Sequence, residues 1–108
     1  MRLVSLNLNG IRSAVNKGLL PWLAQSGADL VCVQELKAQA DNLTDAMRAP
    51  GVFTGYFHFA ERKGYSGVAV YAKRPPRFVA GFGSREFDLE GRYLEAHFAE
   101  LTVVSVYL

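Results

Sequence analysis

Two apolar runs in the sequence each end in side chains that could bind a metal ion or a phosphate. The run Leu30 to Gln34 ends abruptly in Glu35 and Lys37, and an earlier alternating run ends in Asn7 and Asn9. Ligands of open α/β sheets bind at the carboxyl ends of strands, so Glu35 is a candidate metal ligand, although solvated acids after strands are also common. The two amides could hold a carboxylate, a metal-bound water or a phosphate oxygen, or could simply fix a turn.

The elements that position these residues form a predicted strand, helix, strand unit. Residues 3 to 8 alternate between apolar and polar side chains, as expected of a half-buried strand. Gly10 permits a tight turn, after which residues 11 to 16 are expected to form an irregular turn and a helix to open near Pro21 and close at Gly27. The two strands should be parallel, with a right-handed crossover.

The remaining chain predicts short strands joined by turns. A short helix is expected within residues 44 to 47, and Gly81 to Gly91 is expected to be a loop. The predicted strands are a hairpin of residues 56–60 and 67–72, a short strand at 77–80, and a second hairpin of 92–98 and 101–107.

Composition places the chain among globular proteins. It has 108 residues, of which 50% are hydrophobic and 20% are charged, which suits one domain or a part of one. The single cysteine, Cys32, lies within a predicted strand, where a free thiol behaves as a small buried hydrophobe. No apolar run approaches the ~20 residues that cross a bilayer, so we expect a soluble intracellular protein with no membrane partner.

Basic residues are concentrated in one stretch that has no acidic residue from 62 to 77. It contains Arg62, Lys63, Lys73, Arg74 and Arg77, interleaved with two tyrosines. Such a stretch suits a polyanion such as a nucleic-acid backbone, and an ordinary solvated basic surface is the alternative.

Five segments, taken together, resemble the amino-terminal half of the exonuclease III family, the abasic-site endonucleases of the endonuclease/exonuclease/phosphatase superfamily. They are SLNLNGIRSA (5–14), VQELKAQ (33–39), KGYSGVAVYAK (63–73), EGRYLEAHF (90–98) and VVSVYL (103–108). The resemblance spans residues 1 to 108 and implies half of a four-layer α/β sandwich, with a mixed sheet and helices on its outer face. A lone half is expected to expose the inner face of its sheet.

The resemblance also implies roles for individual residues. It implies metal binding by Glu35, Asn7 and Asn9, and catalysis by Tyr107, which approaches the phosphate, and by Asn7. The implied DNA contacts are Tyr65, Ser66, Gly67 and Arg92, with Lys37 and Lys63 near the phosphate path. The implied cofactor is Mg²⁺, with Mn²⁺ as a substitute, and the implied partner is double-stranded DNA with abasic sites or 3′ ends.

The resemblance implies that further catalytic groups of the family lie beyond this half: an Asp-x-Asn motif, another aspartate and an Asp-His pair. The only histidines here are His58 and His97, and neither follows a Ser-Asp pair. The chain alone is therefore expected to be poorly active, and a full-length protein is expected to be a monomer of the bacterial cytoplasm. Two alternatives remain: an inositol-phosphate or sphingomyelin type phosphodiesterase, and a non-catalytic nucleic-acid-binding module.

Overall fold

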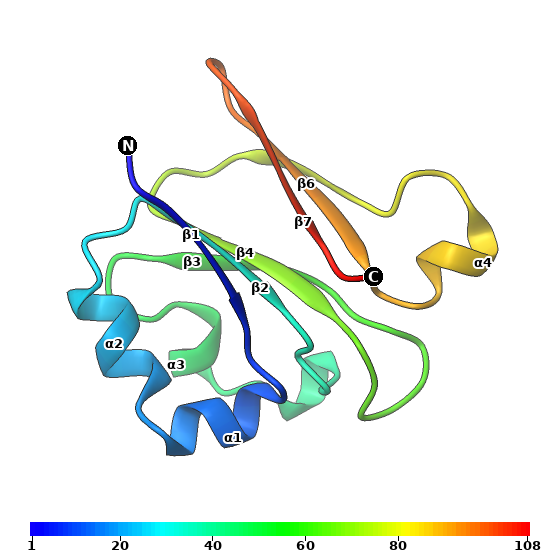
Figure 1. Ribbon diagram of the computed structural model, residues 1–108, viewed down its shortest axis with the longest axis horizontal. Helices are drawn as coiled ribbons and strands as arrows, with labels where there is room; N and C mark the ends of the chain where they lie inside the picture. The colour runs from blue at the N-terminus through cyan, green and yellow to red at the C-terminus, as the bar shows by residue number, and fades with distance from the viewer.

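A computed structural model describes residues 1–108 as two stacked sheets with helices on one side. The four-stranded sheet has the order β1 (Leu3–Asn7), β2 (Leu30–Gln34), β4 (Val68–Ala72), β3 (Thr54–His58). The three-stranded sheet has the order β5 (Arg77–Ala80), β6 (Tyr93–His97), β7 (Thr102–Val106). Figure 1 shows the helices below the larger sheet and the smaller sheet above it, so the predicted α/β class and its mixed sheet are confirmed.

The predicted strand, helix, strand unit is present, with β1 and β2 parallel from Leu3 opposite Leu30 to Asn7 opposite Gln34. Between them lie α1 (Ile11–Asn16) and α2 (Leu19–Gln25). The structure therefore has a short helix where an irregular turn was expected. Pro21 is the third residue of α2, where its missing N–H breaks no intrahelical bond.

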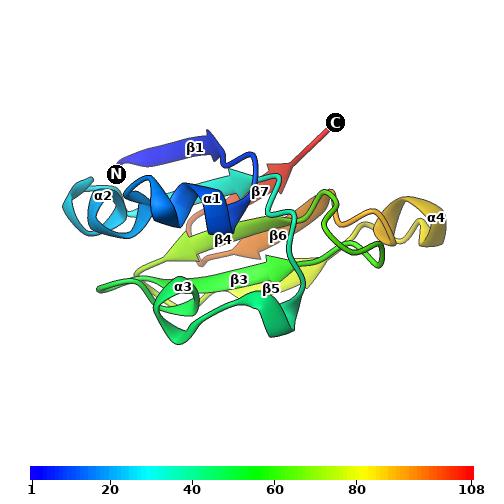
Figure 2. The same ribbon diagram turned by 90° about the horizontal axis from the view of Figure 1, so that it is seen from below.

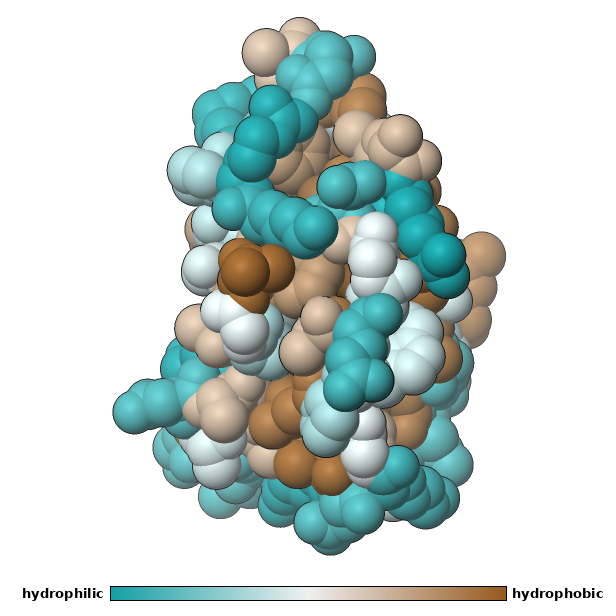
Figure 3. Space-filling model, turned by 90° about the vertical axis from the view of Figure 1, so that its left-hand side faces the viewer, coloured by the Kyte–Doolittle hydropathy of each residue, from teal (hydrophilic) through white to brown (hydrophobic).

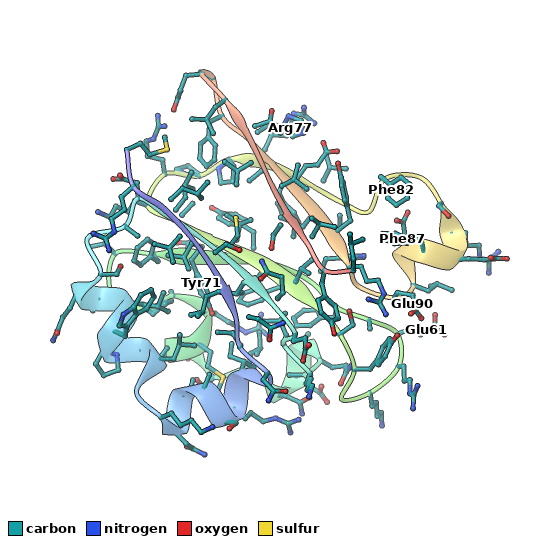
Figure 4. All side chains as sticks on the ribbon, viewed as in Figure 1. Glu61, Tyr71, Arg77, Phe82, Phe87 and Glu90 are labelled. Atoms are coloured by element: carbon teal, nitrogen blue, oxygen red, sulfur yellow. The ribbon has the colours of Figure 1, made fainter.

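The helices and the larger sheet enclose the first of two apolar cores. Ile11 and Leu23 from the helices are fully buried against Val31, Val33 and Tyr71 of the sheet. The Tyr71 hydroxyl donates to the Met47 carbonyl at 2.6 Å, which ties the sheet to α3 (Asp45–Arg48). Figure 4 labels Tyr71 between the sheet and the helices.

The second core lies between the two sheets, and it corrects one expectation. The inner face of the larger sheet is not exposed, because Leu94, Ala96 and Val103 of the smaller sheet pack on Val68 and Val70. Strands β5 to β7 follow in the same chain and fold back over β2 and β4, which the apolar runs alone did not indicate. The face that remains open is the outer face of the smaller sheet, where Val104 and Val106 are exposed.

Both predicted hairpins are present. β3 and β4 are antiparallel, as are β6 and β7. The expected loop at 81 to 91 contains one short helix, α4 (Arg85–Asp88), which projects at the right of Figure 1. Asp88 holds this lobe together, because its carboxylate accepts from the amides of Phe82 and Gly83 at 3.0 and 3.1 Å.

The surface beside β1 is partly apolar. Figure 2 shows β1 at one edge of the larger sheet and β3 at the other. A hollow of about 340 Å³ lies between β1 and the two helices, with Trp22 and Leu19 in its lining. Figure 3 views the left-hand side of Figure 1 and shows hydrophobic residues between hydrophilic ones. None of the helices has the length and apolar character needed to cross a membrane.

Candidate active site

The predicted site residues meet at one edge of the sandwich, which we call the site edge. The parallel strands β1 and β2 both end there: Asn7 is the last residue of β1, Glu35 directly follows β2, and Tyr107 directly follows β7 beside them. Because β4 and β6 run the other way, the loop before β4 and the residue Arg92 before β6 also lie at this edge. The topology therefore brings together residues that are up to 100 positions apart in sequence.

The segment after β2 is bonded on both sides. The carbonyls of Glu35 and Leu36 accept from the amides of Gly10 and Ile11, each at 2.8 Å, so the first amide of α1 is satisfied by the site segment. On the other side, the amides of residues 36 and 37 donate to the carbonyls of residues 67 and 66, at 3.1 and 2.8 Å. These bonds fix the backbone from which the Glu35 side chain projects.

Four non-glycine residues have a left-handed backbone, and all four lie at the site edge. Their φ angles are 48° at Asn9, 55° at Glu35, 51° at Lys37 and 49° at Ser66. This conformation costs roughly 1–2 kcal/mol per residue relative to the ordinary regions, and only the surrounding bonds can hold it. Strain of this kind clusters at functional sites, which marks this edge independently of the side chains.

The Glu35 carboxylate is the centre of the side-chain network. Its Oε1 accepts from Asn7 Nδ2 at 3.3 Å, and its Oε2 lies 3.6 Å from Lys37 Nζ. The pKa of Glu35 is lowered first by the nearby Tyr107 hydroxyl, then by Asn7 and Lys37. Reciprocally, Glu35 raises the pKa of Tyr107, so the carboxylate stays ionised and the phenol stays protonated at neutral pH.

The two asparagines are oriented by the same network. Asn7 Oδ1 accepts from the Asn9 amide at 2.9 Å, which turns its nitrogen toward Glu35, and Asn9 Oδ1 accepts from Lys37 Nζ at 2.7 Å. The candidate metal ligands at this edge are oxygen atoms, and only one of them belongs to a carboxylate. Nowhere do three or more His, Cys, Asp or Glu side chains converge. Such a donor set fits Mg²⁺, which takes oxygen ligands, keeps several waters and is commonly bound through one or two carboxylates.

Arg92 joins the two tyrosines of the site. Its guanidinium lies over the rings of Tyr65 and Tyr107, at 5.6 and 5.1 Å from their centres. It donates to the Tyr65 hydroxyl at 2.7 Å, and that hydroxyl donates to Glu90 at 2.7 Å. With only 18% of its side chain exposed, Arg92 is largely occupied in fixing these tyrosines.

Ser66 and Gly67, which the resemblance assigns to DNA contact, are both buried, and that role stays a prediction. The Ser66 hydroxyl donates to the Gly91 carbonyl at 3.2 Å, and the Gly67 amide donates to the same carbonyl at 3.0 Å. Gly91 itself has no room for a side chain, since a Cβ there would lie 2.3 Å from the amide nitrogen of Ala60. These residues hold the loop in place; the exposed residues of the same loop are Glu61, Arg62, Lys63 and Gly64.

The basic stretch from 62 to 77 does not form one surface. Arg62 and Lys63 lie at the site edge, whereas Lys73 and Arg74 follow β4 at the opposite edge, about 13 Å away along the five-residue strand. Figure 4 shows Arg77 on β5, away from Glu61 and Glu90 at the site edge. The predicted strand of residues 67–72 lies between the two groups of basic residues and therefore places them at opposite edges of the sheet.

Two polar residues that sequence reasoning left without a role connect the sheets beside the site. Gln34 Nε2 donates to the Ser105 hydroxyl at 3.2 Å, and the fully buried Ser105 donates to the Val33 carbonyl at 3.0 Å. A glutamine that ends an otherwise apolar strand was the only indication of this contact in the sequence.

Comparison with known proteins agrees with this geometry. Residues 4–107 match the model of the endonuclease/exonuclease/phosphatase family. The chain is 38% identical to an exodeoxyribonuclease of Bacillus subtilis, over 99% of the chain and 42% of that protein, and 36% identical to the DNA repair nuclease APEX1 of Danio rerio, over 100% of the chain and 36% of that protein. The chain thus spans less than half the length of these relatives.

Solved structures give the same result for the fold. An AP endonuclease from Archaeoglobus fulgidus aligns with a TM-score of 0.81 and 28% identity, over 96% of this chain and 40% of that one. The catalytic domain of APE2 from Xenopus laevis aligns with a TM-score of 0.80 and 31% identity, over 99% and 45%. The predicted resemblance is confirmed: the chain belongs to the endonuclease/exonuclease/phosphatase family and corresponds to the amino-terminal part of its DNA repair nucleases.

Proposed function

We propose that the site edge is one half of a Mg²⁺-dependent DNA phosphodiesterase site, which in a whole protein incises abasic sites and removes nucleotides from 3′ ends. The observation that carries the proposal is the convergence of the Asn7 and Tyr107 side chains on Glu35, whose own backbone is left-handed, at the edge that also carries the exposed cations of Arg62 and Lys63. The names of the relatives, an exodeoxyribonuclease and a DNA repair nuclease, support the choice of DNA as substrate.

The metal would be held by Glu35, and Mn²⁺ is expected to replace Mg²⁺. When bound, the metal would supply positive charge against the scissile phosphate. Asn7 presents its nitrogen to Glu35, so we assign it the role of orienting that carboxylate, and Asn9 supplies an amide oxygen nearby. Lys37 partly neutralises Glu35 and would be free to face the phosphate when a cation takes its place.

The tyrosine and the basic residues would position the DNA. Tyr107 is held protonated beside Glu35 and can donate its hydroxyl hydrogen to a phosphate oxygen. Arg62 and Lys63 would contact the backbone of the duplex, and Tyr65 would form the wall between them and Arg92.

We assign no residue of this chain to removal of the proton from water. His58 is bonded to the Asp88 carbonyl, and His97 pairs with Glu95 on the outer face of the smaller sheet. We therefore expect the 108 residues alone to cleave DNA weakly or not at all, with the missing base supplied by sequence that the longer relatives possess.

The test is incision of a duplex with one abasic site, using the chain and any longer product of the same reading frame. The longer product should cleave with Mg²⁺, lose activity in EDTA and in Glu35→Gln, and keep it in the control Glu100→Gln at the opposite edge. Cleavage that survives Glu35→Gln would overturn the metal-site assignment. Strong EDTA-sensitive cleavage by the 108 residues alone would overturn only the expected inactivity, and salt-sensitive binding without cleavage by a longer product would favour a binding module.

A further inference from the structure

The loop that carries Arg62 and Lys63 is built around one side chain, that of Gln39. Nε2 of Gln39 donates to the carbonyls of Ala60 and Arg62, at 3.3 and 2.9 Å. Its Oε1 accepts from the amide of Gly64 at 3.2 Å. One amide group therefore bonds to three backbone groups within five residues.

No other side chain bonds to the backbone of residues 61 to 65. The loop is fixed at one end by Ala60, which is buried, and by the bond from the Glu61 amide to the Leu89 carbonyl at 2.9 Å. At its other end, Ser66 is buried. Between these points the loop backbone is held by Gln39. Figure 4 labels Glu61 and Glu90 close together at this end of the molecule.

Gln39 is itself held in place. Its backbone N–H donates to Asn42 Oδ1 at 2.9 Å, at the start of the short helix η1 (Ala40–Asn42). It also lies two residues after Lys37, whose left-handed backbone and bond to Ser66 fix the direction of the chain. The side chain thus extends from the strained site segment into the loop.

The chemistry of the three bonds requires an amide. Two carbonyls need donors and one N–H needs an acceptor, and a carboxamide supplies both from one planar group. A glutamate of the same size would place a carboxylate against two carbonyl oxygens, and a methionine would leave all three backbone groups without this partner.

We propose that Gln39 is a positioning residue for DNA, which acts by holding the 60–64 loop so that Arg62 and Lys63 face the backbone of the duplex. This inference rests on the proposed function. Arg62 lies 5.1 Å from the centre of the Tyr65 ring, which in turn contacts Arg92, so the direction in which the loop presents its cations is linked to the rest of the site.

The first experiment measures the loop alone. In Gln39→Met, hydrogen exchange at the Gly64 amide and tryptic cleavage after Arg62 and Lys63 should be faster by about tenfold, because the bonds that hold the loop closed are lost. Exchange in β2 and β4 should be unchanged, and Gln25→Met on the exposed end of α2 is the matched control. Gln39→Glu serves where the methionine variant does not fold. Exchange and cleavage at wild-type rates in a folded variant would overturn the proposal.

The second experiment separates this proposal from the proposed function. Binding of a duplex with a tetrahydrofuran abasic analogue is measured for wild type, Gln39→Met, the double variant Arg62→Gln/Lys63→Gln, and all three changes together. We expect Gln39→Met alone to weaken binding about three- to tenfold. The same change should have little further effect in the double variant, which already lacks both cationic side chains.

The outcomes are distinguishable. If the double variant binds like wild type, the loop is not a DNA contact and the proposed function fails at that point. Two results would overturn the positioning role of Gln39. In the first, the double variant binds weakly while Gln39→Met binds like wild type. In the second, Gln39→Met weakens binding equally in wild type and in the double variant that lacks Arg62 and Lys63.

Discussion

The two edges of the sandwich carry similar residues in different settings. At the site edge, exposed Arg62 and Lys63 accompany Tyr65, and at the opposite edge Lys73 and Arg74 accompany aromatic rings of Phe53 and Phe98. The bases of the opposite edge are paired with acids: Lys73 lies 3.9 Å from Asp29, and Arg74 pairs with Glu100. Arg62 and Lys63 form no such ion pair.

The backbone differs between the edges as well. Every non-glycine residue with a left-handed backbone lies at the site edge, whereas the turn before β2 uses Gly27, with a φ of 68° and no atom within 4 Å of an added Cβ. Charge and aromatic content alone therefore do not distinguish a site from an ordinary surface. The combination of cations that form no ion pair with a strained but hydrogen-bonded backbone is what distinguishes the site edge from an ordinary surface.

The largest expected effect comes from adding one methyl group at each edge. Gly91→Ala should lower the free energy of unfolding by about 2–4 kcal/mol, because the new Cβ would meet the Ala60 backbone and its φ of 60° disfavours a side chain. Gly27→Ala should cost only about 1 kcal/mol, from backbone conformation alone. Urea denaturation measures both, and equal costs would contradict the close packing at the site edge.

DNA binding should separate the edges next. Arg62→Gln/Lys63→Gln should weaken binding and reduce the slope of log K against log salt by up to about 2, since each phosphate contact contributes about 0.9. Lys73→Gln/Arg74→Gln should leave the slope nearly unchanged. Fluorescence anisotropy over a range of salt concentrations measures both variants. A larger loss of affinity in Lys73→Gln/Arg74→Gln would show that DNA binds at the opposite edge and would contradict this account.

The sequence was sufficient for the strands, but not for the short helices α1 and α4 or for how the surfaces of the elements combine. The apolar run ending in Glu35 and the alternation ending in Asn7 were enough to place both side chains at one sheet edge, because parallel strands end together. The burial of Ser66 and the role of Gln39 depend on contacts between segments far apart in the chain, whereas the separation of Lys63 from Lys73 follows from the predicted strand between them. Backbone strain at Glu35 and Lys37 was invisible as well, since neither residue type favours the left-handed region.

Backbone strain can be tested at Asn9 without confusing it with a lost contact. Asn9→Ala and Asn9→Gly both remove the bond to Lys37, so their difference reports the left-handed φ of 48°. The glycine variant should be more stable than the alanine variant by about 1 kcal/mol. At Ser13 within α1 the order of stability should reverse, with Ser13→Ala more stable than Ser13→Gly, because alanine is the better helix former. Thermal unfolding measures both pairs of variants. An alanine variant at position 9 that is more stable than the glycine variant would refute the strain.

The smallest expected effect concerns pH and salt. The pKa of Glu35 is lowered mainly by Tyr107 and Asn7, and that of Glu100 mainly by Arg74. A lowered pKa contributes stability above the ordinary value of about 4.3, and this stability is lost as pH falls through the folded pKa. Carboxyl-carbon NMR titrations at low and high salt should show that the Glu100 pKa rises toward its ordinary value in salt while the Glu35 pKa changes little. Equal salt sensitivity would argue that Glu35 is an ordinary surface acid.

Metal binding at the site edge is the claim on which the others depend, and paramagnetic broadening by Mn²⁺ tests it most directly. In amide NMR spectra, substoichiometric Mn²⁺ should broaden the signals of Asn7, Glu35 and Tyr107, excess Mg²⁺ should restore them, and the effect should vanish in Glu35→Gln while remaining in Glu100→Gln. Broadening centred on Asp29 and Glu100, or broadening at the site edge that survives Glu35→Gln, would contradict the account.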